Sequence, residues 1–257
     1  MIANYHTHTA RCRHALGTDE EYVQSALKRG LRILGFSDHA PYVFEGTYYS
    51  NYRMYMHQLM DYVLSVEGLK KKYAGQIQIH LGLELEYYPK YLPEVLDRLR
   101  DTPIEYVLLG QHFLGNEMDE PYSGAPTEDV SILKRYCDQV IEALNTGLFT
   151  YLAHPDLINF TGDRKIFREQ MRRVCREAKN LGLPVEMNLY GLNLNRNYPG
   201  HDFFAVAAEE GSQVILGCDA HHPLQLEDKP LEQRALEFLK PYDLELISTV
   251  PLRSIHK

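Results

Sequence analysis

The sequence predicts an α/β fold in which parallel strands close into a barrel surrounded by helices. Short apolar runs typical of buried strands recur along the 257 residues, and amphipathic helical segments separate them. An open doubly wound sheet is the main alternative, because periodicity alone does not show closure. The expected strands are Ile2–Tyr5, Ile33–Phe36, Ile77–Leu85, Tyr106–Leu109, Phe149–Leu152, Val185–Asn188 and Val214–Leu216, with a further candidate at Leu244–Ile247.

Three helices can be placed from their start and stop signals. Thr18 and Glu21 form a capping box, which predicts a helix that ends before Gly30. Thr127 is expected to cap a second helix. Apolar stripes at helical spacing cover Val130–Leu144 and Phe167–Leu181, each followed by a glycine. No Pro/Gly/Ser-rich linker or repeat interrupts this series, so we expect a single domain over residues 1–257.

Composition and charge narrow the class of protein. A net charge of -8 argues against nucleic-acid polymers and anionic membranes as partners. No apolar run approaches the roughly 20 residues of a membrane span, and no secretory signal opens the chain. Neither a G-x-G-x-x-G nor a Walker motif occurs, which disfavours nucleotide cofactors. We expect a cytoplasmic protein with four buried free thiols, Cys12, Cys137, Cys175 and Cys218.

Histidines and carboxylates gather at the carboxyl ends of the expected strands. His6 and His8 alternate along the first strand and point to the same side. In a barrel these strand ends converge on one face, where imidazoles and carboxylates can bind zinc, manganese or iron. The residues at these ends are His6, His8, His14, His39, Glu84, Glu86, His112, His154, Asp219 and His221. We expect structural or surface roles for His57, His80, His201, His222 and His256.

In chain order, the strand ends carry the motifs His6-Thr-His8, His14, Ser37-Asp-His39, Gly82-Leu-Glu84, His112, His154-Pro and Asp219-Ala-His221. This series resembles the PHP (polymerase and histidinol phosphatase) superfamily, and the His154-Pro155-Asp156 and Glu186-Met-Asn188 segments look most like its histidinol-phosphate phosphatases. The resemblance implies a distorted (β/α)7 TIM-like barrel with two or three divalent metal ions (zinc, manganese or iron).

The resemblance also implies a ligand set and catalytic residues. The sets are His6, His8, Glu84 and Asp219 for one ion, Glu84 with His112 and His154 for a second, and His14, His39 and His221 for a third. The residues it marks as catalytic are Glu84, Asp219 and His221. Glu86 lies on the same side of its strand as Glu84 by two-residue alternation, so geometry alone does not separate them. Glu86 could instead line the pocket or support a ligand.

The implied activity is hydrolysis of L-histidinol phosphate to L-histidinol and phosphate in histidine biosynthesis, by attack of a metal-bridging hydroxide. Three divalent ions and two carboxylates would give the site a local charge of roughly +4, which would attract a phosphate despite the acidic chain. The alternatives are a PHP phosphoesterase for another small phosphate or a nucleotide 3′-phosphate, and a metal-holding module with little catalysis. A barrel hydrolase acting on C–N bonds is a further alternative, but no lysine ends a middle strand.

Candidate substrate contacts lie in two loops. Arg196 follows the sixth strand and could grip a phosphate bidentately. Tyr42 and Phe44 begin a tyrosine-rich stretch that is expected to form a lid or a pocket wall. Asp38 and Asp156 each neighbour a candidate ligand, and either orient a metal-bound imidazole or cap a turn. The expected partner is therefore a small phosphorylated molecule.

Overall fold

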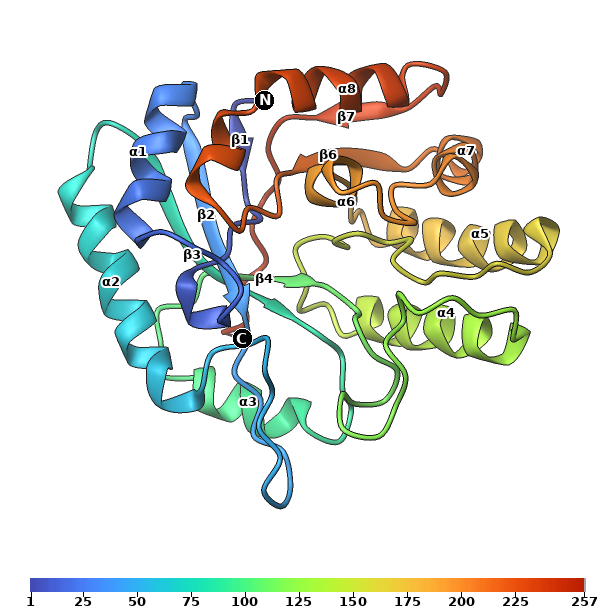
Figure 1. Cartoon of the computed structure of the whole chain (residues 1–257), viewed down its shortest axis with the longest axis horizontal. Helices are drawn as coiled ribbons and strands as arrows, with labels where there is room; N and C mark the ends of the chain where they lie inside the picture. The colour runs from blue at the N-terminus through green and yellow to red at the C-terminus, as the bar shows by residue number, and fades with distance from the viewer. Residues whose placement is uncertain (257) are drawn as a thin grey trace.

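The computed structural model describes residues 1–256, so Lys257, the last residue of the predicted domain, lies outside them. Strands occupy the centre of the molecule and helices surround them (Figure 1). All strand pairs are parallel, in the orders β1-β2-β3-β4 and β5-β6-β7. The strands are β1 Ala3–Asn4, β2 Ile33–His39, β3 Gln78–Leu85, β4 Tyr106–Leu109, β5 Val185–Asn188, β6 Gln213–Gly217 and β7 Glu245–Ile247.

The two sheets form one distorted barrel because isolated backbone bridges connect them at two places. Leu152 pairs with Leu109 at the end of β4 and with Val185 at the start of β5. Thr7, beyond β1, pairs with Ala220, beyond β6. The expected strand at 149–152 is therefore present only as a single bridging residue. The sheet curls into the predicted barrel, and the open-sheet alternative is wrong.

The helices of the outer layer follow the expected signals with one exception. Thr18 caps α1 through a capping box, and Gly30 ends this helix with a φ of 86°. The cap of α4 is Asp129, not Thr127: the Asp129 side chain accepts from Ser131 N at 2.7 Å, while the Thr127 hydroxyl accepts from Asp129 N. The helices are η1 Ala10–Cys12, α1 Asp19–Arg29, η2 Met56–Gln58, α2 Leu59–Lys72, α3 Leu92–Leu99, α4 Val130–Asn145, α5 Arg164–Asn180, α6 Leu189–Asn193, α7 His201–Glu210, η3 Pro223–Glu227 and α8 Lys229–Leu239.

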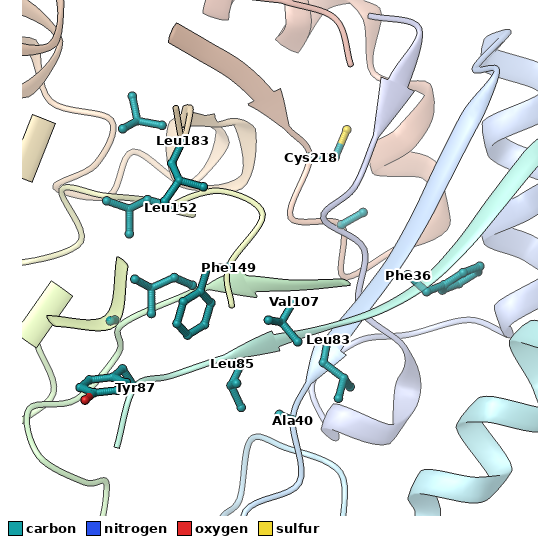
Figure 2. Packing of buried hydrophobic residues seen from close by; sticks show 14 of the residues in the cluster. Phe36, Ala40, Leu83, Leu85, Tyr87, Val107, Phe149, Leu152, Leu183 and Cys218 are labelled. Carbon is teal, nitrogen blue, oxygen red and sulfur yellow. The ribbon is translucent and has the colours of Figure 1, made fainter. Parts of the chain in front are cut away.

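Strand alternation divides the apolar residues between two cores. Leu83, Leu85 and Val107 belong to the large core between the strands and the helices (Figure 2). Tyr106 and Leu108 belong to a smaller core with Tyr5, Tyr151 and Ile215, whose members come from β1, β4, β6 and the bridging segment. The side chains of β3 that alternate with the leucines are then free to carry carboxylates at the end of the barrel.

Two further expectations concern membranes and cysteines. Among residues 1–256, no helix is long and apolar enough to cross a membrane. All four cysteines are buried and free, as expected. Burial is the main cause that raises the pKa of the Cys175 thiol to about 12, so this thiol stays protonated.

Tyr106 provides a test of the inner core, since its buried hydroxyl donates to the carbonyl oxygens of Tyr5 (2.7 Å) and Phe36 (3.1 Å). Tyr106→Phe removes this donor and leaves buried carbonyls less well satisfied. We expect the free energy of unfolding to fall by about 1–3 kcal/mol, measured by urea denaturation. Tyr73→Phe, whose hydroxyl reaches only the partly exposed Glu20, should change it by less than about 0.5 kcal/mol. Equal losses of stability in the two variants would contradict a structural role for the Tyr106 hydroxyl.

Candidate metal centre

The nine predicted ligands meet at one end of the barrel, around the buried carboxylate of Glu84. Its two oxygens face ring nitrogens of five histidines. The distances are 2.7 Å to His154 Nε2, 2.9 Å to His39 Nδ1, 3.6 Å to His8 Nε2, 3.6 Å to His112 Nε2 and 3.7 Å to His6 Nε2. Asp219 Oδ1 lies 3.1 Å from His8 Nε2 and 3.5 Å from His6 Nε2. The structure thus brings together residues from strand ends that are far apart in sequence.

His14 and His221 form the outer part of this cluster. Nδ1 of each ring contacts a backbone carbonyl oxygen at 2.9 Å, Cys12 for His14 and Asp219 for His221. Since Nδ1 must donate there, Nε2 of each neutral ring carries only a lone pair. The two Nε2 atoms nevertheless face each other at 2.9 Å. Two lone pairs repel at that distance, whereas a cation shared between them would attract both.

Unsatisfied buried atoms give a second test of whether these residues fit a metal. Nε2 of His6, Nε2 of His8, Nδ1 of His39 and Oε2 of Glu84 are buried and make no well-aligned hydrogen bond, although His39 Nδ1 lies 2.9 Å from Glu84 Oε2. Buried polar atoms without partners are costly and rare. Imidazole nitrogens and carboxylate oxygens are the ligands that zinc, manganese and iron accept. The arrangement therefore fits divalent metal ions, and these four atoms are of the kinds that would bind them.

The predicted ligand sets can be compared with these positions. His14, His39 and His221 have potential ligand atoms within 4.8 Å of one another, and so do His6, His8 and Asp219. His6, Glu84 and His154 also form such a group, as do His8, His39 and Glu84. The groups overlap at Glu84 and His8, so neighbouring ions would share ligands. The division of the nine residues among individual ions stays a prediction.

Each side of the cluster has a carboxylate that fixes the far nitrogen of an imidazole. Glu186 Oε1 lies 2.8 Å from His6 Nδ1, Glu86 Oε1 lies 2.9 Å from His112 Nδ1, and Asp38 Oδ1 lies 3.4 Å from His8 Nδ1. A carboxylate at Nδ1 holds the proton there and leaves Nε2 free to bind a metal. Glu86 is thus a supporting residue. Sequence reasoning missed the role of Glu186, although it lies on a buried strand near its carboxyl end, as Glu84 does.

Asp156, unlike Asp38, contacts the backbone of a loop and not a histidine ring. Its Oδ2 accepts from Gly200 N at 2.6 Å, and Asn197 Nδ2 donates to Leu157 O at 3.0 Å. These bonds tie the loop that follows His154 to the loop that carries Arg196. Asp156 therefore holds a turn, which is the second of its two predicted roles. Burial raises its pKa to about 7.

The charges in the cluster favour a cation. Burial alone would raise the pKa of Glu84, but the surrounding imidazoles, His112 first, hold it well below its ordinary value. Burial also lowers the pKa of His221 to about 3, with a further lowering from His8, so its ring is neutral. The pKa of His8 rises to about 9 despite burial, because Asp219 and Asp38 attract its proton. A metal ion among these carboxylates would take the place of that proton.

The backbone is shaped to bring the ligands close together. His154 and Asp219 have positive φ angles of 27° and 48°, a region that non-glycine residues seldom occupy. Gly110 and Gly217 leave room for the carboxylates: a Cβ atom on Gly110 would meet Glu84 Oε1 at 1.8 Å, and one on Gly217 would meet Glu186 Oε1 at 1.8 Å. Glycine at these two positions is a steric requirement of the site.

A cavity of about 210 Å³ opens onto the cluster. Its size suits a small molecule. Arg196 lines it, with its guanidinium 5.2 Å from the centre of the Tyr190 ring. The lining residues are His14, His39, Tyr52, Glu84, His112, Phe113, Tyr122, Tyr190, Arg196, Tyr198, Asp219 and His221.

Tyr42 and Phe44, the other two predicted substrate contacts, lie elsewhere. They stack on each other and line a separate cavity of about 510 Å³, and the Tyr42 hydroxyl donates to Glu86 O. The prediction that Tyr42 and Phe44 line the wall of the metal cavity was therefore wrong. The tyrosine-rich stretch that begins with Tyr42 does reach the metal cavity, but through Tyr52. His222 is exposed and caps η3 through its ring, away from the cluster.

Fold and site together define a metal-binding α/β barrel with a cavity that suits a small molecule. A family model described as the PHP domain matches residues 4–190. The chain belongs to the PHP domain family. A curated relative from Deinococcus radiodurans, described as a "probable histidinol-phosphatase", is 32% identical over 231 residues, which are 86% of this chain and 87% of the relative. Histidinol-phosphatase from Bacillus subtilis is 34% identical over 116 residues, 42% of this chain and 43% of the relative.

Solved structures agree on the fold. The crystal structure of histidinol phosphate phosphatase from Lactococcus lactis, complexed with zinc, L-histidinol and phosphate, has a TM-score of 0.74 to this chain. The structural match covers 99% of this chain and 97% of the Lactococcus lactis chain, and the two sequences are 16% identical. The family model confirms the predicted superfamily, and the structural similarity confirms the predicted barrel.

Gly110 allows a direct test of the cluster geometry. Gly110→Ala places a methyl group where the Glu84 carboxylate lies and must displace it. We expect zinc affinity, measured by competition with a chromophoric chelator, to fall by at least about 10-fold. Gly68→Ala is the matched control, since a Cβ atom there meets nothing within 4 Å. Unchanged affinity in the Gly110 variant would show that Glu84 is not a ligand.

Proposed function

We propose that this chain is a metal-dependent phosphomonoesterase that hydrolyses L-histidinol phosphate to L-histidinol and phosphate. The observation that carries the proposal is the cavity itself, in which Arg196 shares the lining with several predicted metal ligands, Glu84 and Asp219 among them. A phosphate group there would contact a guanidinium and lie beside the metal ligands. The relatives described as histidinol-phosphatases, one of them similar over most of both chains, support this substrate.

The proposed cofactor is two or three divalent ions, zinc, manganese or iron, held by His6, His8, His14, His39, Glu84, His112, His154, Asp219 and His221. When bound, such ions lower the pKa of a coordinated water and neutralise phosphoryl oxygens. Glu84, Asp219 and His221, which the family resemblance marks as catalytic, belong to the cluster and line the cavity, as His14, His39 and His112 also do.

The remaining lining residues would bind and orient the substrate. Arg196 would donate two hydrogen bonds to the phosphate and stabilise the charge that develops on it. Tyr52, Phe113 and Tyr190 offer aromatic faces to the imidazole and ammonium groups of histidinol. Enclosure by these rings would also exclude bulk water, which strengthens every charge interaction inside. We also propose a reducing, cytoplasmic location, supported by the four free cysteines.

Phosphate release from a panel of monoesters tests the substrate. We expect the zinc-, manganese- or iron-loaded protein to hydrolyse L-histidinol phosphate with a kcat/KM at least about 100-fold above that for glycerol phosphate or a nucleotide 3′-phosphate. The reason is that only histidinol offers cationic groups to the aromatic wall, and each lost polar contact costs about 1.5–3 kcal/mol. Preference for the nucleotide would favour the alternative PHP substrate, and no hydrolysis with full metal content would refute both.

Arg196 should contribute to phosphate binding and not to metal binding. Arg196→Met removes a charge-assisted contact worth about 1.5–3 kcal/mol, so kcat/KM should fall by roughly 10- to 100-fold. Zinc content should stay unchanged. Arg164→Met is the control, because Arg164 pairs with Asp202 on the exposed surface and should leave the kinetics as they are. Unchanged kcat/KM in Arg196→Met would show that Arg196 does not bind the phosphate.

A further inference from the structure

An arginine lies buried behind the metal cluster, although its segment projects from the barrel. Residues 41–55, which connect β2 to η2, extend outward near α3 (Figure 1). Arg53 returns from this segment into the interior and is only 1% exposed. Nε donates to Glu117 Oε2 at 3.0 Å, one terminal nitrogen donates to Ala40 O at 2.8 Å and Glu86 Oε2 at 3.0 Å, and the other donates to Glu86 Oε1 at 3.0 Å. No part of the guanidinium is available to a substrate.

Two of these partners, Glu86 and Ala40, connect Arg53 to the metal cluster. Glu86 Oε1, which accepts from Arg53, also lies 2.9 Å from His112 Nδ1. Ala40 directly follows the predicted ligand His39. Tyr52 directly precedes Arg53, lines the cavity, and packs its ring 5.3 Å from that of His39. One buried cation therefore contacts, through a single intermediate group, two predicted ligands and a wall of the cavity.

We propose that Arg53 is a positioning residue that fixes His112 for metal binding, acting through Glu86. The planar guanidinium takes both oxygens of Glu86 and so sets the plane of that carboxylate. With its plane set, Oε1 accepts from His112 Nδ1, and His112 Nε2 faces Glu84 at 3.6 Å. The hydrogen bond to Ala40 O fixes the end of β2 at the same time.

The charge balance supports a role for arginine in particular. Glu86 and Glu117 are both buried, and Arg53 is the cation that lies between them. A lysine would keep the positive charge but present one compact ammonium group, which cannot hold both oxygens of Glu86 together with Glu117 and Ala40. Replacement by lysine therefore separates geometry from charge. Arg53→Met would instead leave two buried carboxylates without a cation, and loss of folding would obscure the result.

The inference rests on the proposed metal role of His112, and zinc alone is the probe. Arg53→Lys, Glu86→Gln and the double variant are compared with the parent by zinc competition against a chromophoric chelator and by thermal unfolding of the apo forms. We expect Arg53→Lys to remain folded, to lose at least about 10-fold in affinity for one zinc ion, and to regain activity in excess zinc. Arg29→Lys, at a partly buried pair with Glu232 outside the cluster, should bind zinc as the parent does.

The double variant decides whether Arg53 acts through Glu86. If it does, adding Arg53→Lys to Glu86→Gln should weaken zinc binding little further. Unchanged zinc affinity in Arg53→Lys, with or without a loss of apo stability, would overturn the proposal, and so would fully additive losses. Hydrolysis of histidinol phosphate by the parent is measured in the same preparations. Its absence would refute the proposed substrate, while the zinc affinities would still report on Arg53.

Discussion

One buried carboxylate, Glu84, faces ring nitrogens of five histidines, and the end of the barrel is built around that contact. A carboxylate with no solvent and a surplus of imidazoles is stable only if positive charge enters the cluster. Protons can supply part of it, as the raised pKa of His8 shows. Divalent ions would supply more charge and would satisfy the lone pairs of His14 and His221, whose Nε2 atoms face each other at 2.9 Å.

Other features of the fold follow from the need to hold this cluster. Gly110 and Gly217 clear space for carboxylates, and the positive φ angles of His154 and Asp219 turn two ligands inward. Carboxylates behind the imidazoles then fix which ring nitrogen is free. The cost of this arrangement is met by the two apolar cores, which pack both faces of the strands. Stability thus comes from the apolar faces of the strands, and the candidate metal ligands lie at the carboxyl ends.

The sequence predicted those features that depend on neighbouring residues or on the regular alternation of a strand. Strand alternation placed His6 and His8 on one side, and strand ends gathered the nine ligand candidates, because parallel strands share a direction. Closure of the barrel was not predictable from periodicity, since it depends on single bridges at Leu152 and Thr7. Tyr42 and Phe44 were placed in the cavity wall because aromatic residues suit it, but the path of an irregular loop has no periodic signal. The burial of Arg53 could not be predicted for the same reason, since nothing in the local sequence distinguishes a buried arginine from a surface one.

The central claim is that Glu84 and the surrounding histidines bind divalent metal ions. Anomalous diffraction at the zinc edge, from crystals grown with zinc, tests it most directly. The account predicts two or three strong peaks within coordination distance of these side chains, at least one of them beside a Glu84 oxygen and another between His14 and His221. Full-occupancy zinc only at surface residues such as His222, with the ring nitrogens around Glu84 bonded to water, would contradict it.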